Sequence, residues 1–111
     1  MNNKVTVDTA IRQLGTEKKQ RYTTMMQHGS MVVEYYAPVK IDSQQPHSQD
    51  ELYVIISGTG IFYNDGERVT FKTGDVLFVP AGTEHRFENF TDDFATWVIF
   101  YGPEGGEKDF R

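Results

Sequence analysis

The stretch GDVLFVPAGTEHRFENF, residues 74–90, divides into two short strand-like runs around a turn. The first run, VLFVP, closes at Pro80, because proline cannot donate a hydrogen bond to a neighbouring strand. Gly82 would then let the chain turn tightly into the second run, HRFENF. Side chains alternate across a strand, so His85 and Phe87 should share one face. The stretch therefore predicts an imidazole on the same face as an aromatic side chain.

The rest of the chain continues this pattern of short strands separated by turn residues. Asp65-Gly66 is a strong hairpin signal, because glycine tolerates the positive φ angle that a tight turn needs. The other predicted strands are RYTTMMQ, SMVVEYYAP, LYVIIS, IFYN, RVTF and FATWVIFY. Many short strands at even spacing are typical of a β-sandwich or a β-barrel, so we expect an all-β fold.

Two of the predicted strands, LYVII and WVIFY, are apolar on both faces. A strand with one face in water would alternate, so another sheet, the N-terminal helix or a second subunit should cover the second face. That short helix is predicted over TAIRQLG, with Thr6 or Asp8 as its N-cap and Gly15 as its end. Ile11 and Leu14 would lie on one face of it.

Length, charge and composition exclude several classes of protein. The chain of 111 residues fits one domain, 1–111, with a buried core. Residues 1–20 would hold the helix and its lead-in, and the Gly-rich residues 103–111 a flexible tail. The net charge of −5 argues against a nucleic-acid partner. No apolar run is long enough for a membrane span or a secretion signal, so a cytoplasmic protein is the default expectation. The chain has no cysteine, which excludes thiolate ligands.

A second stretch, PHSQDELYVIISGTG, places His47 four residues before Glu51. On a straight strand these residues would lie roughly 13 Å apart, at about 3.3 Å per residue. Ligands of one metal ion each lie only about 2.0–2.2 Å from that ion. If both side chains bind one ion, the chain must turn between them, and Ser48-Gln49-Asp50 is a plausible turn sequence.

Together the two stretches resemble the two signature motifs of the cupin superfamily. The first motif matches from its second histidine onward, and the second motif matches at every position. The matching residues are His47, Glu51 and Gly58 in the first motif, and Gly74, Pro80, Gly82, His85 and Asn89 in the second. The resemblance implies a jelly-roll barrel, the double-stranded β-helix, of the small conserved-barrel type, commonly assembled as a homodimer.

The resemblance also implies a divalent metal held by three histidines and a glutamate. Gln45 stands where the family has its first histidine, with Gln44 beside it. An amide oxygen is a weaker ligand for a transition metal than an imidazole. His47, Glu51 and His85 are therefore the candidate metal ligands, with Gln45 or Gln44 as a candidate fourth. Iron, manganese, nickel and zinc are all admissible.

Other residues receive predicted roles from their positions. Tyr53 is the nearest proton-transfer candidate along the chain. Tyr53, Phe62, Phe78, Phe87 and Trp97 are expected to wall a pocket at the mouth of the barrel. We expect Asn89 to be a hydrogen-bonding turn residue, and His28, at a predicted hairpin turn, to be exposed without a role.

Two imidazoles and one carboxylate are the ligand set typical of non-haem Fe(II) sites with open positions. We therefore expect a metal-dependent enzyme that acts on a small organic molecule as a dioxygenase, decarboxylase or isomerase. The metal would act as a Lewis acid or bind O₂. The alternative is a non-catalytic module that binds or senses a small ligand, with or without metal, and the glutamine at the first ligand position favours it. Fold alone does not choose between the two.

Overall fold

A computed structural model of the protein describes residues 3–17 and 20–108. Within these residues the elements are α1 (Val7–Gly15), β1 (Tyr22–His28), β2 (Met31–Tyr36), β3 (Asp50–Ser57), β4 (Gly60–Asn64), β5 (Glu67–Phe71), β6 (Val76–Val79), β7 (His85–Glu88) and β8 (Ala95–Tyr101). Each predicted strand overlaps one observed strand, which confirms the all-β fold with a short N-terminal helix. No helix in the described part of the chain is long and apolar enough to cross a membrane.

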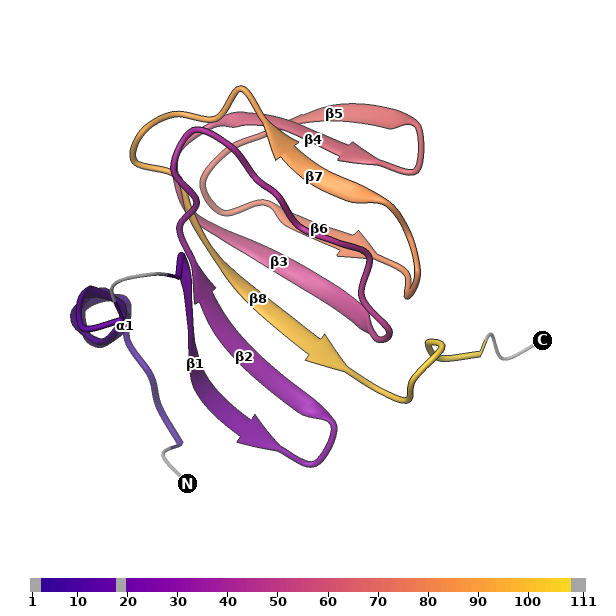
Figure 1. Ribbon diagram of the computed structural model, residues 1–111, viewed down its shortest axis with the longest axis horizontal. Coiled ribbons are helices and arrows are strands. Elements are labelled where there is room, and N and C mark those ends of the chain that lie inside the picture. Colours follow the sequence, from indigo (N-terminus) through magenta and orange to yellow (C-terminus); the bar gives the residue numbers. More distant parts are fainter. Residues whose placement is uncertain (1–2, 18–19, 109–111) are drawn as a thin grey trace.

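The strands form two antiparallel sheets that face each other (Figure 1). The larger sheet has the order β1-β2-β8-β3-β6, and the smaller sheet has the order β5-β4-β7. The hairpin between β4 and β5 turns at Asp65 and Gly66, with φ angles of 51° and 89°, as the sequence predicted. Because β7 pairs only with β4, its other edge has no neighbouring strand in its sheet.

Aromatic rings fill the space between the two sheets. Phe87 lies at the centre of the stack, with its ring centroid 4.6 Å from that of Phe94, 4.8 Å from that of Tyr53 and 4.9 Å from that of Phe62. The stack reaches His85, whose ring centroid lies 6.2 Å from that of Tyr53. The candidate site therefore borders the aromatic core directly.

Helix α1 covers part of the outer face of the larger sheet. Thr6 is its N-cap, with its side chain accepting a hydrogen bond from the Thr9 N–H at 3.1 Å. Ala10 is completely buried against a second apolar cluster that contains Tyr35 and Ala95. The helix thus shields part of the outer apolar face of the sheet that contains the strands LYVII and WVIFY, which are apolar on both faces.

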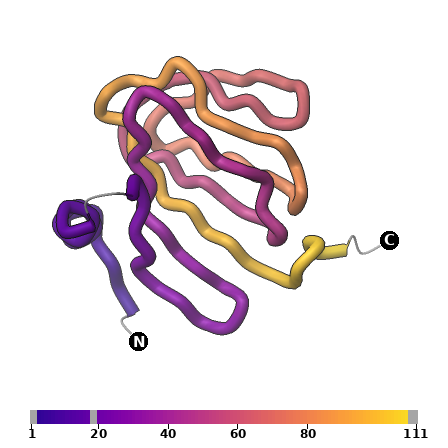
Figure 2. The backbone as a smooth tube through the Cα atoms, viewed as in Figure 1, coloured from indigo at the N-terminus to yellow at the C-terminus, as the bar shows by residue number. Residues whose placement is uncertain are grey.

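The connection between β2 and β3, residues 37–49, runs across the molecule beside β7 (Figure 2). Its closest tie to β7 is a buried hydrogen bond of 2.7 Å from the Phe87 N–H to the carboxylate of Asp42. This connection carries His47 at its end, so its path determines where the first candidate ligand lies.

Candidate metal centre

His47 and Glu51 lie on either side of a bend. The backbone bends at Ser48 and Gln49, and β3 starts at Asp50, which is the turn that joint metal binding required. The side chain of Glu51 is fully buried, whereas 32 % of the His47 side chain is exposed. His47 is therefore the candidate ligand closest to solvent.

His85 approaches from the turn that precedes β7. Gly82 has a φ of 75°, a backbone conformation that favours glycine. The N–H of Gly82 donates a hydrogen bond of 2.7 Å to the carbonyl of His47. The two sequence motifs are thus bonded to each other through their backbones, and this bond places His85 opposite His47.

The three side chains offer donor atoms that all lie within 4.8 Å of one another. Glu51 Oε1 lies 3.0 Å from His85 Nε2 and 3.8 Å from His47 Nε2. Neither contact has the direction of a hydrogen bond: the two Nε2 atoms and both carboxylate oxygens of Glu51 are buried without a hydrogen-bond partner in the described structure. Four buried polar atoms without partners are costly, and a cation among them would satisfy all four.

The ring of His85 is held in the tautomer that metal binding needs. Its Nδ1 lies 2.8 Å from the carbonyl of Thr83. Because a carbonyl can only accept, Nδ1 must carry the proton, which leaves the Nε2 lone pair free to bind an ion. The residues present therefore fit a divalent transition metal.

Burial and neighbouring charge act differently on the two imidazoles. Burial lowers the pKa of His85, but the Glu51 carboxylate and the Thr83 carbonyl outweigh it, and the net pKa lies above the usual 6.5. For His47 burial dominates and its pKa is lowered, because the attraction of Glu51 is partly cancelled by His85. His47 is the readier of the two to lose its proton to a metal.

The C-terminal segment, residues 102–107, braces the loop between His47 and Glu51. The N–H of Gly105 donates to the carbonyl of Ser48 at 2.7 Å, and Gln49 Nε2 donates to the carbonyl of Gly102 at 2.9 Å. We expected residues 103–111 to be a flexible tail. In the structure Gly105 and Glu107 are hydrogen-bonded to Ser48 and Asp50, and residues 109–111 lie outside the described part of the chain.

Asp50 joins three parts of this site. One carboxylate oxygen accepts from the N–H of Ala81 at 2.9 Å, and the other accepts from the N–H of Glu107 at 2.8 Å. Ala81 belongs to the turn before His85, and Glu107 belongs to the C-terminal brace. A single buried carboxylate therefore links the segments of both motifs to the end of the chain.

Gln44, and not Gln45, points into the interior. Gln45 is exposed and lies outside the pocket, so it does not replace the missing histidine. Gln44 Oε1 accepts a hydrogen bond from the Tyr53 hydroxyl at 2.8 Å, and its Nε2 donates to Asp42 at 2.8 Å. Both ends of the Gln44 amide are therefore engaged, which leaves three candidate ligands for an ion among the described residues.

Tyr53 is completely buried and acts through Gln44. Burial and the nearby Glu51 carboxylate raise the pKa of Tyr53 well above 10, so its hydroxyl stays protonated and donates to Gln44. The structure thus gives Tyr53 a contact that positions Gln44, and the proton-transfer role of Tyr53 stays a prediction.

Asp42 is a buried residue of the site that the sequence did not reveal. Its carboxylate accepts hydrogen bonds from the Tyr36 hydroxyl at 2.5 Å, the Phe87 N–H at 2.7 Å, and the backbone and side chain of Gln44 at 3.2 and 2.8 Å. It occupies the open edge of β7, where a neighbouring strand would otherwise bond. A single aspartate in an irregular connection carries no sequence signal for this role.

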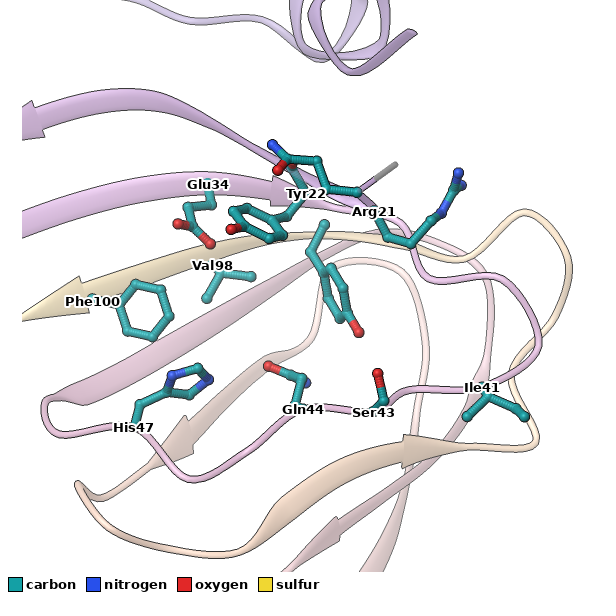
Figure 3. A pocket seen from close by; sticks show the side chains of 11 residues that line it. Arg21, Tyr22, Glu34, Ile41, Ser43, Gln44, His47, Val98 and Phe100 are labelled. Carbon is teal, nitrogen blue, oxygen red and sulfur yellow. The ribbon is translucent and has the colours of Figure 1, made fainter. Parts of the chain in front are cut away.

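A pocket of about 550 Å³ opens beside His47 (Figure 3). One wall comes from β2 and β8 (Glu34, Tyr36, Val98, Phe100), the other from the connection (Ile41, Ser43, Gln44, His47), and residues 20–22 form the rim. The ring of His47 packs edge-on against Phe100, with centroids 4.8 Å apart. Of the three candidate ligands only His47 lines the pocket, so a small molecule would reach the site past its ring.

The aromatic residues that we expected in the pocket wall lie elsewhere. Phe62 and Phe87 are buried in the aromatic core, and Phe78 points outward from the edge strand β6 with 48 % of its surface exposed. Trp97 packs against Tyr35 in the cluster under α1. Alternation predicts which residues share a face, but in strands that are apolar on both sides it does not say which face is inside.

The fold and the site together define a small jelly-roll protein with a candidate two-histidine, one-carboxylate centre. Residues 32–101 match the family Cupin_2, described as a cupin domain, and the chain belongs to this family. The structure is similar to that of a Cupin 2 conserved barrel domain protein from Salinispora arenicola, with a TM-score of 0.66 and 20 % identity over 92 % of this chain and 89 % of that one.

Two sequence relatives show how far the similarity extends. An uncharacterized protein of Streptomyces coelicolor is 35 % identical over 85 residues, which cover 75 % of this chain and 81 % of that protein. Acireductone dioxygenase 1 of Pectobacterium atrosepticum is 39 % identical over 71 residues, 60 % of this chain. The match spans only 41 % of that dioxygenase.

Proposed function

We propose that this chain is a metal-dependent cupin that acts on a small organic molecule and uses His47, Glu51 and His85 as ligands. The observation that carries the proposal is the group of four buried donor atoms without hydrogen-bond partners, all within 4.8 Å of one another. A structural site would leave such atoms paired with each other or with backbone groups.

Each residue has a separate task in this proposal. Glu51 brings the negative charge that offsets the cation, and Thr83 keeps Nε2 of His85 available. His47 forms the boundary between the site and the pocket. A bound ion would supply Lewis-acid or redox chemistry at that boundary. Since Gln44 is engaged on both sides, the remaining coordination positions are left for the small molecule.

Two functions are compatible with this site, an enzyme and a non-catalytic binding module. The relative named acireductone dioxygenase supports an oxygenase, and decarboxylation or isomerisation would use the same three ligands. The exposed position of Gln45 supports the alternative, a cupin that binds or senses a small ligand without converting it. Oxygen consumption by the Fe(II)-loaded protein, measured over a panel of small acids and diketones, separates the oxygenase from the binding module.

Metal content tests the site directly, and the third histidine provides a matched control. We expect the protein, purified without a metal-affinity tag, to hold about one divalent ion per chain by elemental analysis. His47→Ala and His85→Ala should each lose most of it, because two protein ligands bind too weakly to retain an ion. His28→Ala should keep the wild-type content, because His28 is exposed at the end of β1.

Folding and loading must be checked in the same samples. Circular dichroism should show that the three alanine variants keep the β-sheet spectrum. A wild-type protein that stays empty after incubation with Fe(II), Mn(II), Ni(II) and Zn(II) contradicts the metalloenzyme. Metal content that survives in folded His85→Ala contradicts the assigned ligands.

The C-terminal brace can be tested with two neighbouring glycines. A Cβ atom on Gly106 would lie 2.8 Å from Asp50 Oδ1 and 3.2 Å from the Cβ of Ala81, whereas one on Gly105 would meet nothing within 4 Å. Both glycines have φ near 90°, so alanine causes similar backbone strain at each. We expect Gly106→Ala to weaken metal binding roughly 10-fold more than Gly105→Ala, the size expected for a disturbed support of a ligand.

Competition with a chromogenic chelator measures these two affinities. Equal affinities of the two glycine variants would show that the brace does not reach the site.

A homodimer and a cytoplasmic location remain predictions from the resemblance and the composition. Light scattering of the purified protein measures the first, and fractionation of cells measures the second.

A further inference from the structure

The pocket beside His47 contains a second polar group, the carboxyl group of Glu34. Glu34 lies on β2 directly opposite Val98 of β8, and both residues line the pocket with Phe100. Figure 3 shows the carboxylate of Glu34 close to Val98 and Phe100, across the pocket from Gln44 and His47. Glu34 is the one charged residue in the otherwise apolar strand MVVEYY.

Glu34 has no cationic partner in the described part of the chain. None of the ion pairs within 4.0 Å includes it. Burial raises the pKa of Glu34, a hydrogen bond from Thr24 lowers it in part, and the charge of Glu51 raises it further. The carboxylate is therefore held in surroundings that disfavour its charge, as is frequent where a ligand supplies the missing partner.

Among the described residues that line the pocket, Arg21 is the one arginine or lysine, and it does not fill this role. Its Nε donates to the carbonyl of Ala37 at 2.9 Å. In Figure 3 its guanidinium group points away from Glu34. No described residue of the pocket lining therefore pairs with the charge of Glu34.

We propose that the pocket takes a small molecule with an oxygen donor at one end and an amino group at the other. This inference rests on the proposed metal site. The oxygen donor lies at the metal site beside His47, and the ammonium group pairs with Glu34. A short apolar stem between them packs along Val98 and Phe100.

Charge explains why an amine fits better than other groups of the same size. An ammonium group would neutralise the negative charge of Glu34 and donate a hydrogen bond to its carboxylate. A second carboxylate would place a like charge beside it. A methyl group would bury the carboxylate without a cationic partner, which costs more than leaving it in water. Hydrogen bonds to charged groups contribute enough for a preference of about 10-fold or more.

Matched probes test the assignment in the Mn(II)-loaded protein. The probes are 4-aminobutanoate and 5-aminopentanoate, each compared with the acid in which methyl replaces ammonium, pentanoate and hexanoate, and with glutarate. Titrations followed by ligand-detected NMR give the affinities. At least one amino acid should bind about 10-fold more tightly than its methyl counterpart. Equal or tighter binding of the methyl acids or of glutarate overturns the assignment.

Two variants test whether Glu34 causes the preference for the amino acids. Glu34→Gln should reduce it to within about 2-fold, and Glu84→Gln, at an exposed glutamate outside the pocket, should leave it unchanged. A preference that persists in Glu34→Gln overturns the role of Glu34. Repeating the titrations after metal removal separates the two proposals. If the protein binds no metal, the titrations of the stripped protein still measure the preference for the amine. If the protein binds metal but shows no preference for the amine, the ligand assignment is wrong and the proposed metal site stands.

Discussion

Glu51→Gln should stabilise the protein stripped of metal and at the same time remove most of its affinity for metal. At pH 8 we expect the stripped variant to be about 1–3 kcal/mol more stable than the stripped wild type. We expect its affinity for Mn(II) or Zn(II) to fall more than 100-fold, because even a lost support of a ligand costs roughly 10–100-fold.

The reason lies in the two acceptors that face each other at 3.0 Å. Thr83 fixes the proton of His85 on Nδ1, so Nε2 presents a lone pair to Glu51 Oε1. Without a cation these two atoms repel, and the buried carboxylate has no donor. A glutamine amide can turn its N–H groups toward Nε2, which replaces the repulsion with a hydrogen bond. The cation loses its only anionic ligand in the same step.

The pH dependence of this effect has a defined sign. Because the pKa of His85 in the folded protein lies above 6.5, its protonated form stabilises the wild type most fully below pH 6.5. That contribution is lost as the pH rises through the folded pKa. The advantage of Glu51→Gln in the stripped protein should therefore shrink as the pH falls toward 6.5.

Urea unfolding with and without metal measures both parts of this prediction. Glu84→Gln is the control, since Glu84 is exposed and its replacement should change stability by less than about 0.5 kcal/mol. A stripped Glu51→Gln protein that is clearly less stable than the stripped wild type at pH 8 would show that Glu51 is already satisfied. The main argument for a cation would then be lost.

Asp42→Ala should have the opposite effect on stability and destabilise the protein by about 3–4 kcal/mol. Asp42 is also a buried carboxylate that has no cationic partner among the described residues, but four donors point at it. Alanine would leave the buried N–H of Phe87 without an acceptor and release the Tyr36 hydroxyl and Gln44. Each buried donor left unpaired costs about 1–3 kcal/mol.

Thermal unfolding checks this prediction, and a loss of this size lowers the melting temperature by more than about 10 °C in a domain of this length. Asp92→Ala, at an exposed acidic position, is the control and should shift it by no more than a few degrees. Asp42→Asn should fall between the two, because it keeps one acceptor oxygen for Phe87. A change below 1 kcal/mol in Asp42→Ala would show that the connection 37–49 does not need this anchor.

These two carboxylates show where prediction from sequence stopped. Both are acidic residues near the first motif, and the spacing identified Glu51 as a candidate ligand but said nothing of Asp42. The difference is the number of donors that reach each carboxylate, and the donor of the buried hydrogen bond to Asp42, Phe87, lies 45 residues away along the chain. Local pattern holds no information about contacts at that separation.

The amide side chains and the pocket wall also show that local sequence pattern does not decide which side chains face the interior. Spacing placed Gln45 at the first ligand position, yet the backbone turns Gln44 inward and leaves Gln45 in water. The predicted aromatic wall failed at Phe78 and Trp97, because alternation in a strand with two apolar faces leaves the inner face undecided.

The sequence by itself determined the succession of strands along the chain, the N-terminal helix, the Asp65-Gly66 hairpin and the three candidate metal ligands. These features depend on nearest neighbours: alternation, capping, turn residues and the spacing of the two motifs. Only the tertiary structure decided that the donor atoms of His47, Glu51 and His85 converge unpaired, that Glu34 faces the pocket and that the C-terminal segment braces the site. Such features depend on which distant segments meet in space. Whether a charge or a lone pair has a partner is decided only when those segments come together.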